Sequence, residues 1–209
     1  MLSYAILPLA MGTISLAVSV PKGLVQSTAD WCQGLGPGAF DTAPNFTLAA
    51  YDTSGSNANT TGVPLVLTET SLDSDTAYMA IATYATQPDN TFAAFSLSQG
   101  VLSPNVNATG VNVTDLSVNS GDAPSFVASE TSVPAPAQVY CGVADTDPHG
   151  GNPYPILSVN KDTDSFSLCK STSGDSNGQD IVVFEAAQGS SDYDFSTCTP
   201  VHVQLIGLD

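Results

Sequence analysis

The chain has 209 residues, 42% of them hydrophobic, and carries 3 Lys or Arg against 20 Asp or Glu, a formal net charge of −17. Binding to a phosphate backbone needs several Lys or Arg contacts, so this composition excludes a nucleic-acid partner and disfavours an anionic membrane surface. We interpret the acidity as a feature that keeps an extracellular protein soluble, and the alternative is a sink for metal ions or a cationic partner. The length suits one domain with its own core.

The first residues have the character of a leader. Residues 1–19 are apolar, contain no acidic residue and end in the small-x-small pattern Ala17-Val18-Ser19, which predicts a cleaved signal peptide. The alternative is an uncleaved membrane anchor, but Gly12, Thr13 and Ser15 interrupt the run and its length barely suffices to span a bilayer. Residues 20–30 are expected to form a short pro-segment or a disordered start.

Two further features agree with secretion to the extracellular space. The chain has four acceptor sequons for N-linked sugar, at Asn45, Asn59, Asn107 and Asn112. Its four cysteines, an even number behind a signal peptide, predict two disulfides. Three connectivities are possible, and we favour Cys32–Cys141 and Cys169–Cys198, because the second pair would tie the strand at 164–169 to the start of the final strand.

Short runs rich in Val, Ile, Phe, Tyr and Thr recur along the chain, and Gly, Pro, Asn, Asp and Ser separate them. The predicted strands are Phe46–Tyr51, Val63–Leu67, Tyr78–Tyr84, Phe92–Leu97, Val101–Ser103, Phe126–Ala128, Gln138–Val143, Ile156–Val159, Phe166–Cys169, Ile181–Glu185 and Val201–Ile206. This pattern predicts a single all-β domain over residues 31–209. We expect an antiparallel sandwich or closed barrel of about ten to twelve short strands, with a β-trefoil-like arrangement as a further option.

Two tight hairpins are expected within this series. One turns at Gln99-Gly100, and the other turns at Asp162–Asp164 and joins the strands at 156–159 and 166–169. The longest loop is expected from Ser103 to Ser125 and carries two of the sequons.

Residues that could carry chemistry are few. The two histidines, His149 in a turn-rich loop and His202 in the last strand, are too few for a copper or zinc centre. We expect His202 to face solvent or a partner. The only glutamates are Glu69, Glu130 and Glu185, and a pair of them could serve glycoside hydrolysis.

The acidic turns give no stronger signal. Asp145 and Asp147 are two residues apart, but Ile156 falls where a calcium loop of the EF-hand type needs its Glu, so we interpret them as solvated turn residues. The sequence therefore predicts no catalytic residue, no bound cofactor and no metal site. We also expect a structural role for Trp31, the only tryptophan, because it is adjacent to Cys32.

Three segments, Gly34–Leu67, Ala82–Asn105 and Cys198–Ile206, resemble the small, non-catalytic subunit of heterodimeric fungal laccases. More broadly they are similar to small secreted fungal β-proteins, including spore-associated cell-wall proteins. The resemblance implies a glycosylated accessory subunit that binds and stabilises a large multicopper oxidase, and it offers no site residues to transfer.

The first functional hypothesis is therefore a secreted accessory subunit that is not an enzyme and whose partner is a large catalytic laccase subunit. A stand-alone cell-wall or extracellular matrix protein is the alternative, and a small hydrolase or sugar-binding module is the third. Because sugars crowd their surroundings, we expect the contact face in the C-terminal half, on the sequon-free segments 154–159, 181–185 and 201–206.

Overall fold

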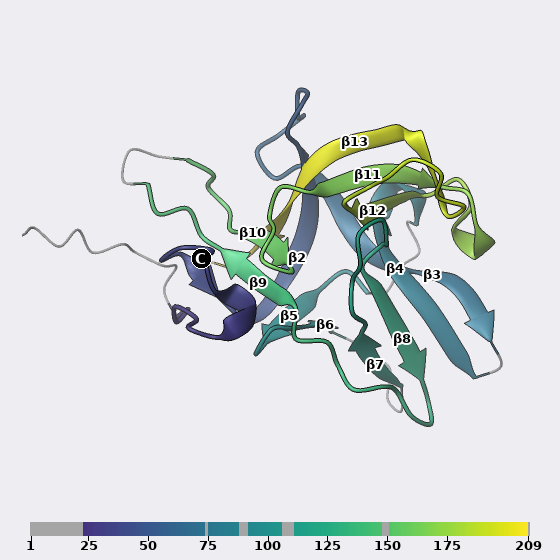
Figure 1. Cartoon of the computed structure of the whole chain (residues 1–209), viewed down its shortest axis with the longest axis horizontal. Helices are drawn as coiled ribbons and strands as arrows, with labels where there is room; N and C mark the ends of the chain where they lie inside the picture. The colour runs from purple at the N-terminus through teal and green to yellow at the C-terminus, as the bar shows by residue number, and fades with distance from the viewer. Residues whose placement is uncertain (1–22, 74, 88–91, 106–110, 148–150, 209) are drawn as a thin grey trace, which may run out of the picture.

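The computed structural model describes residues 23–73, 75–87, 92–105, 111–147 and 151–208 (Figure 1). The predicted signal peptide, the sequon at Asn107 and His149 lie outside these residues. Within the described part the chain is all-β, with thirteen strands and three 3-10 helices of one turn each, η1 (Asp30–Cys32), η2 (Tyr84–Thr86) and η3 (Gly174–Ser176). The all-β prediction is therefore confirmed.

Each predicted strand overlaps an observed one. The strands are β1 (Ala39–Phe40), β2 (Ala43–Asp52), β3 (Val63–Asp73), β4 (Thr76–Thr83), β5 (Phe95–Ser98), β6 (Val101–Pro104), β7 (Asn112–Asp115), β8 (Ser125–Ser129), β9 (Tyr140–Val143), β10 (Ile156–Val159), β11 (Phe166–Ser171), β12 (Asp180–Phe184) and β13 (Tyr193–Ile206).

Strand pairing closes a ring, which makes the centre of the molecule a barrel. The sheet runs β13–β11–β12–β4–β3–β2, and β2 pairs in turn with β13, all of it antiparallel. β13 can border two strands at once because it is long: Val201 lies opposite Phe166 of β11 on one side and opposite Asp52 of β2 on the other. Of the predicted arrangements, these pairings favour the closed barrel over the sandwich.

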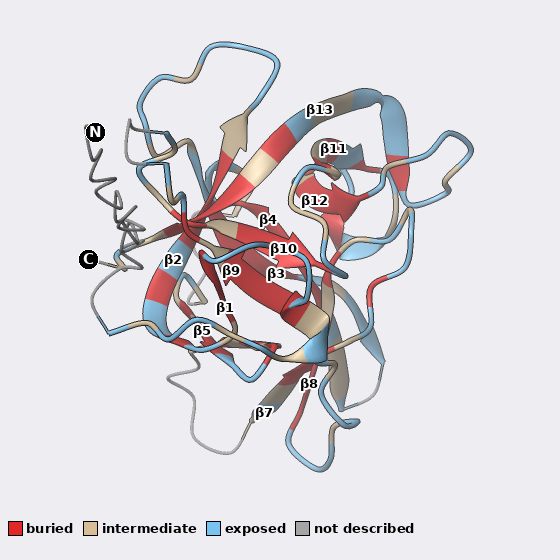
Figure 2. Ribbon diagram, turned by 60° about the vertical axis from the view of Figure 1, so that its left-hand side comes forward, coloured by how far each residue is buried: buried red, intermediate tan, exposed pale blue. Residues whose placement is uncertain are grey.

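The alternation of side chains fills this barrel. Residues directly opposite each other in antiparallel strands point to the same face. The register therefore places one set of apolar side chains on the inner face: Leu48, Ala50, Leu65, Leu67, Ile81, Phe166, Val182, Phe184, Val201, Val203 and Leu205. All of them belong to the main core cluster and all are buried. Figure 2 shows buried residues along the central strands and exposed residues mainly in the loops.

Aromatic side chains pack into the same core beside the end of the barrel where β2 begins. Phe46, near the start of β2, lies opposite Phe95 of β5, and the ring of Phe95 lies 6.5 Å from that of Phe126 in β8. All three side chains are buried. Each such side chain stabilises the fold by about 1.5–3 kcal/mol relative to an exposed one. The opposite end of the barrel, where β2 ends, is concave.

Three expectations about local structure are corrected. The predicted loop from Ser103 to Ser125 contains a strand, β7, whose pattern Asn-Val-Thr-Asp has too little apolar alternation to signal one. β13 begins eight residues before Val201, because its polar first half pairs with β11. The turn expected at Asp162–Asp164 lies at Asn160–Lys161, where Val159 bridges Asp162, but the predicted pairing of the two strands is wrong. β10 pairs with β9 and β13, whereas β11 pairs with β12 and β13.

The other hairpin is present, and its turn explains the position of the tryptophan. Gln99 and Gly100 both have positive φ angles, 50° and 80°, as a two-residue turn between β5 and β6 requires. A methyl group at Gly100 would come within 2.6 Å of Trp31 Nε1. The indole therefore covers this turn, and Gly100 is needed both for its backbone angle and for this close approach.

The cysteines form the two disulfides favoured by the sequence. Cys32–Cys141 ties η1 to β9 across a sequence separation of 109, and Cys169–Cys198 ties β11 to β13. The second bond lies where the register of β11 against β13 shifts between Leu168 and Lys170. It holds together the two strands at a point where the regular ladder of hydrogen bonds is interrupted.

Candidate ligand-binding site

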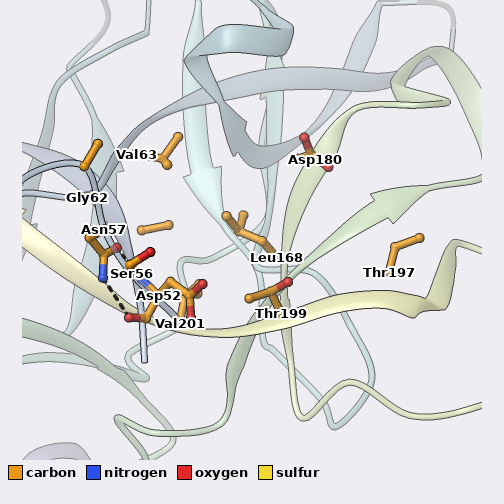
Figure 3. Close-up of a pocket in the computed structure, with 12 residues that line it drawn as sticks. Asp52, Ser56, Asn57, Gly62, Val63, Leu168, Asp180, Thr197, Thr199 and Val201 are labelled. Carbon is orange, nitrogen blue, oxygen red and sulfur yellow. Dashed lines mark hydrogen bonds between the residues drawn. The ribbon is translucent and has the colours of Figure 1, made fainter. Parts of the chain in front are cut away.

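The concave end of the barrel is the candidate site, here called the mouth. It is an open cavity of about 460 Å³, lined by the end of β2, the loop from 53 to 62, the start of β3 and parts of β11, β12 and β13 (Figure 3). Several of its residues continue the inward-facing rows of the barrel, since Asp52 lies opposite Val201 and Leu168 lies opposite Thr199. Barrel mouths are common ligand sites.

The floor of the mouth is apolar and part of it is open to solvent. Val201 and Ala50 are buried at 2% and 1% exposure, whereas Val63 keeps 43% of its surface exposed. Leu168 is half-buried, packs against the main core and lines the cavity. A ligand that covered Val63 and Leu168 would remove apolar surface from water, which is favourable in proportion to the area covered.

One wall of the mouth is the polar loop that follows β2. Asp52 Oδ1 accepts hydrogen bonds from Ser54 N at 2.7 Å, Ser54 Oγ at 2.9 Å and Gly55 N at 2.8 Å. The hydrogen bonds from the Ser54 amide and hydroxyl, with a further one from Gly55, hold the pKa of Asp52 below its usual value. The side chain of Asn57 bonds both the N–H and the C=O of Asp52 at 2.9 Å. These contacts fix the loop against the end of the strand.

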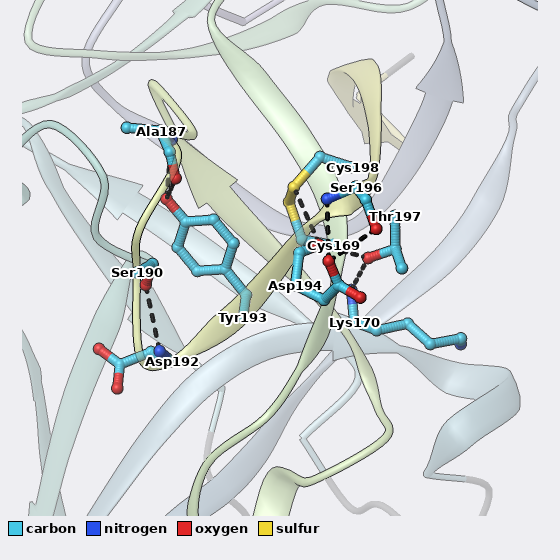
Figure 4. The surroundings of a disulfide bond; sticks show 10 residues. All are labelled: Cys169, Lys170, Ala187, Ser190, Asp192, Tyr193, Asp194, Ser196, Thr197 and Cys198. Carbon is cyan, nitrogen blue, oxygen red and sulfur yellow. Dashed lines mark hydrogen bonds between the residues drawn. A yellow bond between two sulfur atoms is a disulfide. The ribbon is translucent and has the colours of Figure 1, made fainter.

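The facing wall holds an ion pair and two threonines. Lys170 Nζ lies 2.8 Å from Asp180 Oδ1, and both side chains are partly exposed. Thr197 Oγ1 accepts a hydrogen bond from Lys170 N and donates one to Asp194 O, beside the Cys169–Cys198 disulfide (Figure 4). The disulfide and these hydrogen bonds therefore fix the position of this wall.

A second polar feature lies in the core, away from the mouth. Asp115 is fully buried, and its carboxylate accepts hydrogen bonds from Leu102 N and Ala137 N, both at 3.1 Å. Burial raises its pKa to about 6, although the hydrogen bonds from Leu102 and Ala137 act in the opposite direction. Burial, and next to it the charge of Asp115, raises the pKa of the Tyr140 hydroxyl. Asp115 joins β6, β7 and the segment before β9, so we assign it a structural role.

Most residues that the sequence singled out for chemistry lie apart from the mouth. His202 Nε2 lies 2.9 Å from Asp164 Oδ1, and the imidazole is 29% exposed, so it faces a neighbouring carboxylate at the surface. Glu69, Glu130 and Glu185 are exposed on β3, after β8 and after β12. None of these side chains lines the mouth.

In the acidic turns, the carboxylates of Asp145 and Asp162 accept hydrogen bonds from nearby backbone N–H groups. Asp145 accepts hydrogen bonds from Asp147 N and Asn152 N, both at 2.8 Å, and these bonds lower its pKa. Asp162 caps Asp164 N and Ser165 N in the same way. Among the described residues, no group of three His, Cys, Asp or Glu side chains is placed to hold a metal ion. In the same part of the chain, no helix is long and apolar enough to cross a membrane.

Three of the four sequons lie on described residues, and the asparagine is exposed in each of them: Asn45 and Asn112 on strands, Asn59 on the loop at the mouth. Asn59 Oδ1 accepts hydrogen bonds from Thr61 N, Thr61 Oγ1 and Gly62 N at 2.8–3.1 Å. The Asn59 sequon is therefore next to the candidate site, since Gly62 lines the mouth.

The contact face expected on 154–159, 181–185 and 201–206 needs correction. These segments contain β10, β12 and the second half of β13, and their apolar side chains are mostly buried within the chain itself. Ile181 through Phe184 are all buried, because β12 is covered on both faces. Their apolar side chains are mostly part of the core, so the open apolar surface at the mouth is the better candidate for contact with a partner.

No family model, no curated protein and no solved structure matches this chain. The mouth residues were also missed by reasoning from the sequence, since Asp52 lies more than 100 positions before Leu168 and Asp180. The only local signal was a carboxylate directly after the strand at 46–51, followed by a turn-rich segment. Which end of the barrel stays open depends on strand pairing, which the sequence alone did not reveal.

Proposed function

We propose that this chain is a secreted, glycosylated and non-catalytic accessory subunit that binds and stabilises a large folded partner. From the sequence resemblance, we further propose the catalytic subunit of a fungal laccase as that partner. The observation that carries the proposal is the mouth: an open apolar floor between polar walls that are fixed by hydrogen bonds within the chain. A preorganised surface of this kind loses little conformational entropy on binding.

Secretion and glycosylation are supported by independent features. Two disulfides are typical of proteins that fold in an oxidising compartment. The exposed asparagines Asn45 and Asn112, which do not line the mouth, can carry sugar without displacing the core. Stabilisation would follow from mass action, because a subunit that binds only the folded oxidase stabilises it by about 2.7 kcal/mol at a hundredfold excess over Kd.

The test is gel filtration of the native secreted material. An accessory subunit should elute with an oxidase, well above its own mass, whereas a stand-alone cell-wall protein should run alone or sediment with walls. Removing the chain should leave the turnover rate of the oxidase unchanged and shorten its half-life on heating. Immediate loss of turnover, or an unchanged half-life, would contradict the proposal.

Matched variants connect this test to the mouth. Val63→Asp places a charge on the exposed apolar floor, while Leu72→Asp makes the same kind of change at a side chain that is 62% exposed. Both lie on β3, about 30 Å apart at the usual rise of a strand. We expect Val63→Asp to weaken co-elution with the partner and Leu72→Asp to leave it unchanged; equal effects would exclude the mouth.

A second candidate, a sugar-binding or other small-ligand module, is favoured by the size of the cavity. Its volume of about 460 Å³ lies within the usual range for small-ligand sites. Thr199 and Asn57 offer polar groups beside the apolar floor. Such a module would bind oligosaccharides as an isolated chain, without an oxidase.

A further inference from the structure

Of the two carboxylates that line the mouth, Asp180 lies beside a cationic side chain and Asp52, among the described residues, does not. Asp180 is paired with Lys170, but the carboxylate of Asp52, in the part of the chain that the structure describes, accepts hydrogen bonds only from neutral groups of Ser54 and Gly55. Asp52 therefore keeps a full negative charge beside the apolar floor formed by Val63 and Leu168. A ligand that complements both features needs a positive charge at one end of an aliphatic stem.

We propose that the mouth receives a basic side chain, lysine or arginine, from the partner protein. This inference rests on the proposed function and names the group that the partner contributes. The methylene stem would cover Val63 and Leu168, and the cationic head would lie at Asp52. Lys and Arg side chains bury their stems against apolar surface while their heads stay polar, so one residue can satisfy the whole site.

Two further properties of the chain agree with a cationic ligand. The chain has 3 basic and 20 acidic residues, so its field attracts cations and repels anions from every direction. The hydrogen bonds from Ser54 and Gly55 lower the pKa of Asp52, which keeps this carboxylate charged in an acidic medium. The ion pair between Lys170 and Asp180 shows that this end of the barrel already accommodates one ammonium group beside a carboxylate.

The probe for the isolated chain is n-butylammonium, which carries the stem and head of a lysine side chain. Matched probes are 1-butanol, which has the stem without the charge, and butyrate, which has the opposite charge. In an NMR titration of the full secreted chain, butylammonium should give saturable shifts at Ala50, Val63, Leu168 and Thr199. Its affinity should fall as salt is added, because the attraction is electrostatic.

Two variants with the same change in net charge locate the site. Asp52→Asn keeps an oxygen that can accept the hydrogen bonds of the loop, and Glu130→Gln removes a charge from an exposed position after β8. Loss of one charge at contact distance should weaken butylammonium binding about fivefold. We expect this loss in Asp52→Asn and wild-type affinity in Glu130→Gln. Equal binding of butanol, or an unaffected Asp52→Asn, would overturn the inference.

The same variants separate this inference from the proposed function. If Asp52→Asn retains the partner at wild-type strength in gel filtration, the cationic contact is wrong and the accessory-subunit proposal stands. If butylammonium binds at the mouth but no oxidase co-elutes, the mouth is a cation site and the accessory-subunit proposal fails. A dimer that forms through the mouth as concentration rises would place a second copy there and overturn the inference.

Discussion

The buried carboxylate of Asp115 makes the stability of the fold depend on pH in a direction opposite to that of most paired acids. Its pKa is raised from 3.8 to about 6, so between these values the folded chain binds a proton that the unfolded chain has lost. This contribution to stability is complete below about pH 3.8 and is lost as the pH rises through about 6. At about 1.4 kcal/mol per pKa unit, the full effect is about 3 kcal/mol, of which about 2 kcal/mol falls between pH 4 and pH 7.

The Asp115→Asn variant removes this titration and keeps the shape of the side chain. The amide oxygen can accept the hydrogen bond from Ala137 N, but the amide nitrogen then faces Leu102 N, which is also a donor. This mismatch should destabilise the variant by about 1–3 kcal/mol at every pH. The pH-dependent difference in unfolding free energy between wild type and variant is therefore separable from the constant loss caused by this mismatch.

The assay is urea unfolding at several pH values, followed by the fluorescence of Trp31, the only tryptophan. The difference in unfolding free energy between wild type and Asp115→Asn should shrink by about 2 kcal/mol from pH 4 to pH 7. Exposed acids with lowered pKa, such as Asp52 and Asp145, titrate alike in both proteins and cancel. A flat difference for Asp115→Asn would refute the reasoning.

Three other predictions concern the turn at Gly100, the Cys169–Cys198 disulfide and one of the sequons. Gly100→Ala should lower the unfolding free energy by more than about 1 kcal/mol, because its positive φ and the nearby Trp31 ring both oppose a side chain; wild-type stability in denaturant melts would contradict this. Replacing Cys169 and Cys198 together by Ser should cost about 3–4 kcal/mol for a loop of 29 residues, and thiol titration of the denatured wild type should find no free cysteine. Asn112→Gln, which lies away from the mouth lining, should lower the mass of the expressed protein by one glycan, whereas an unchanged mass would show an empty sequon.

Much of the fold could be predicted from sequence because its signals are local. The run Phe46–Tyr51 is a short apolar and aromatic segment typical of a strand, and Gln99-Gly100 has the residues that a two-residue turn requires. The disulfide pairing was also anticipated. β7 escaped prediction because its residues are stabilised by pairing with β8 and by the buried Asp115, and neither signal is local.

The sequence by itself determined that the chain is all-β, that it is strongly acidic and roughly where most of its strands lie, because composition, apolar runs and turn residues act over a few neighbours. Only the tertiary structure decided that β2 meets β13 and closes a barrel, since that pairing joins residues about 150 positions apart. The same closure decided the site. Asp52, Val63 and Leu168 converge because the registers of β2, β3 and β11 around the ring bring them to the same end of the barrel, where the cavity opens.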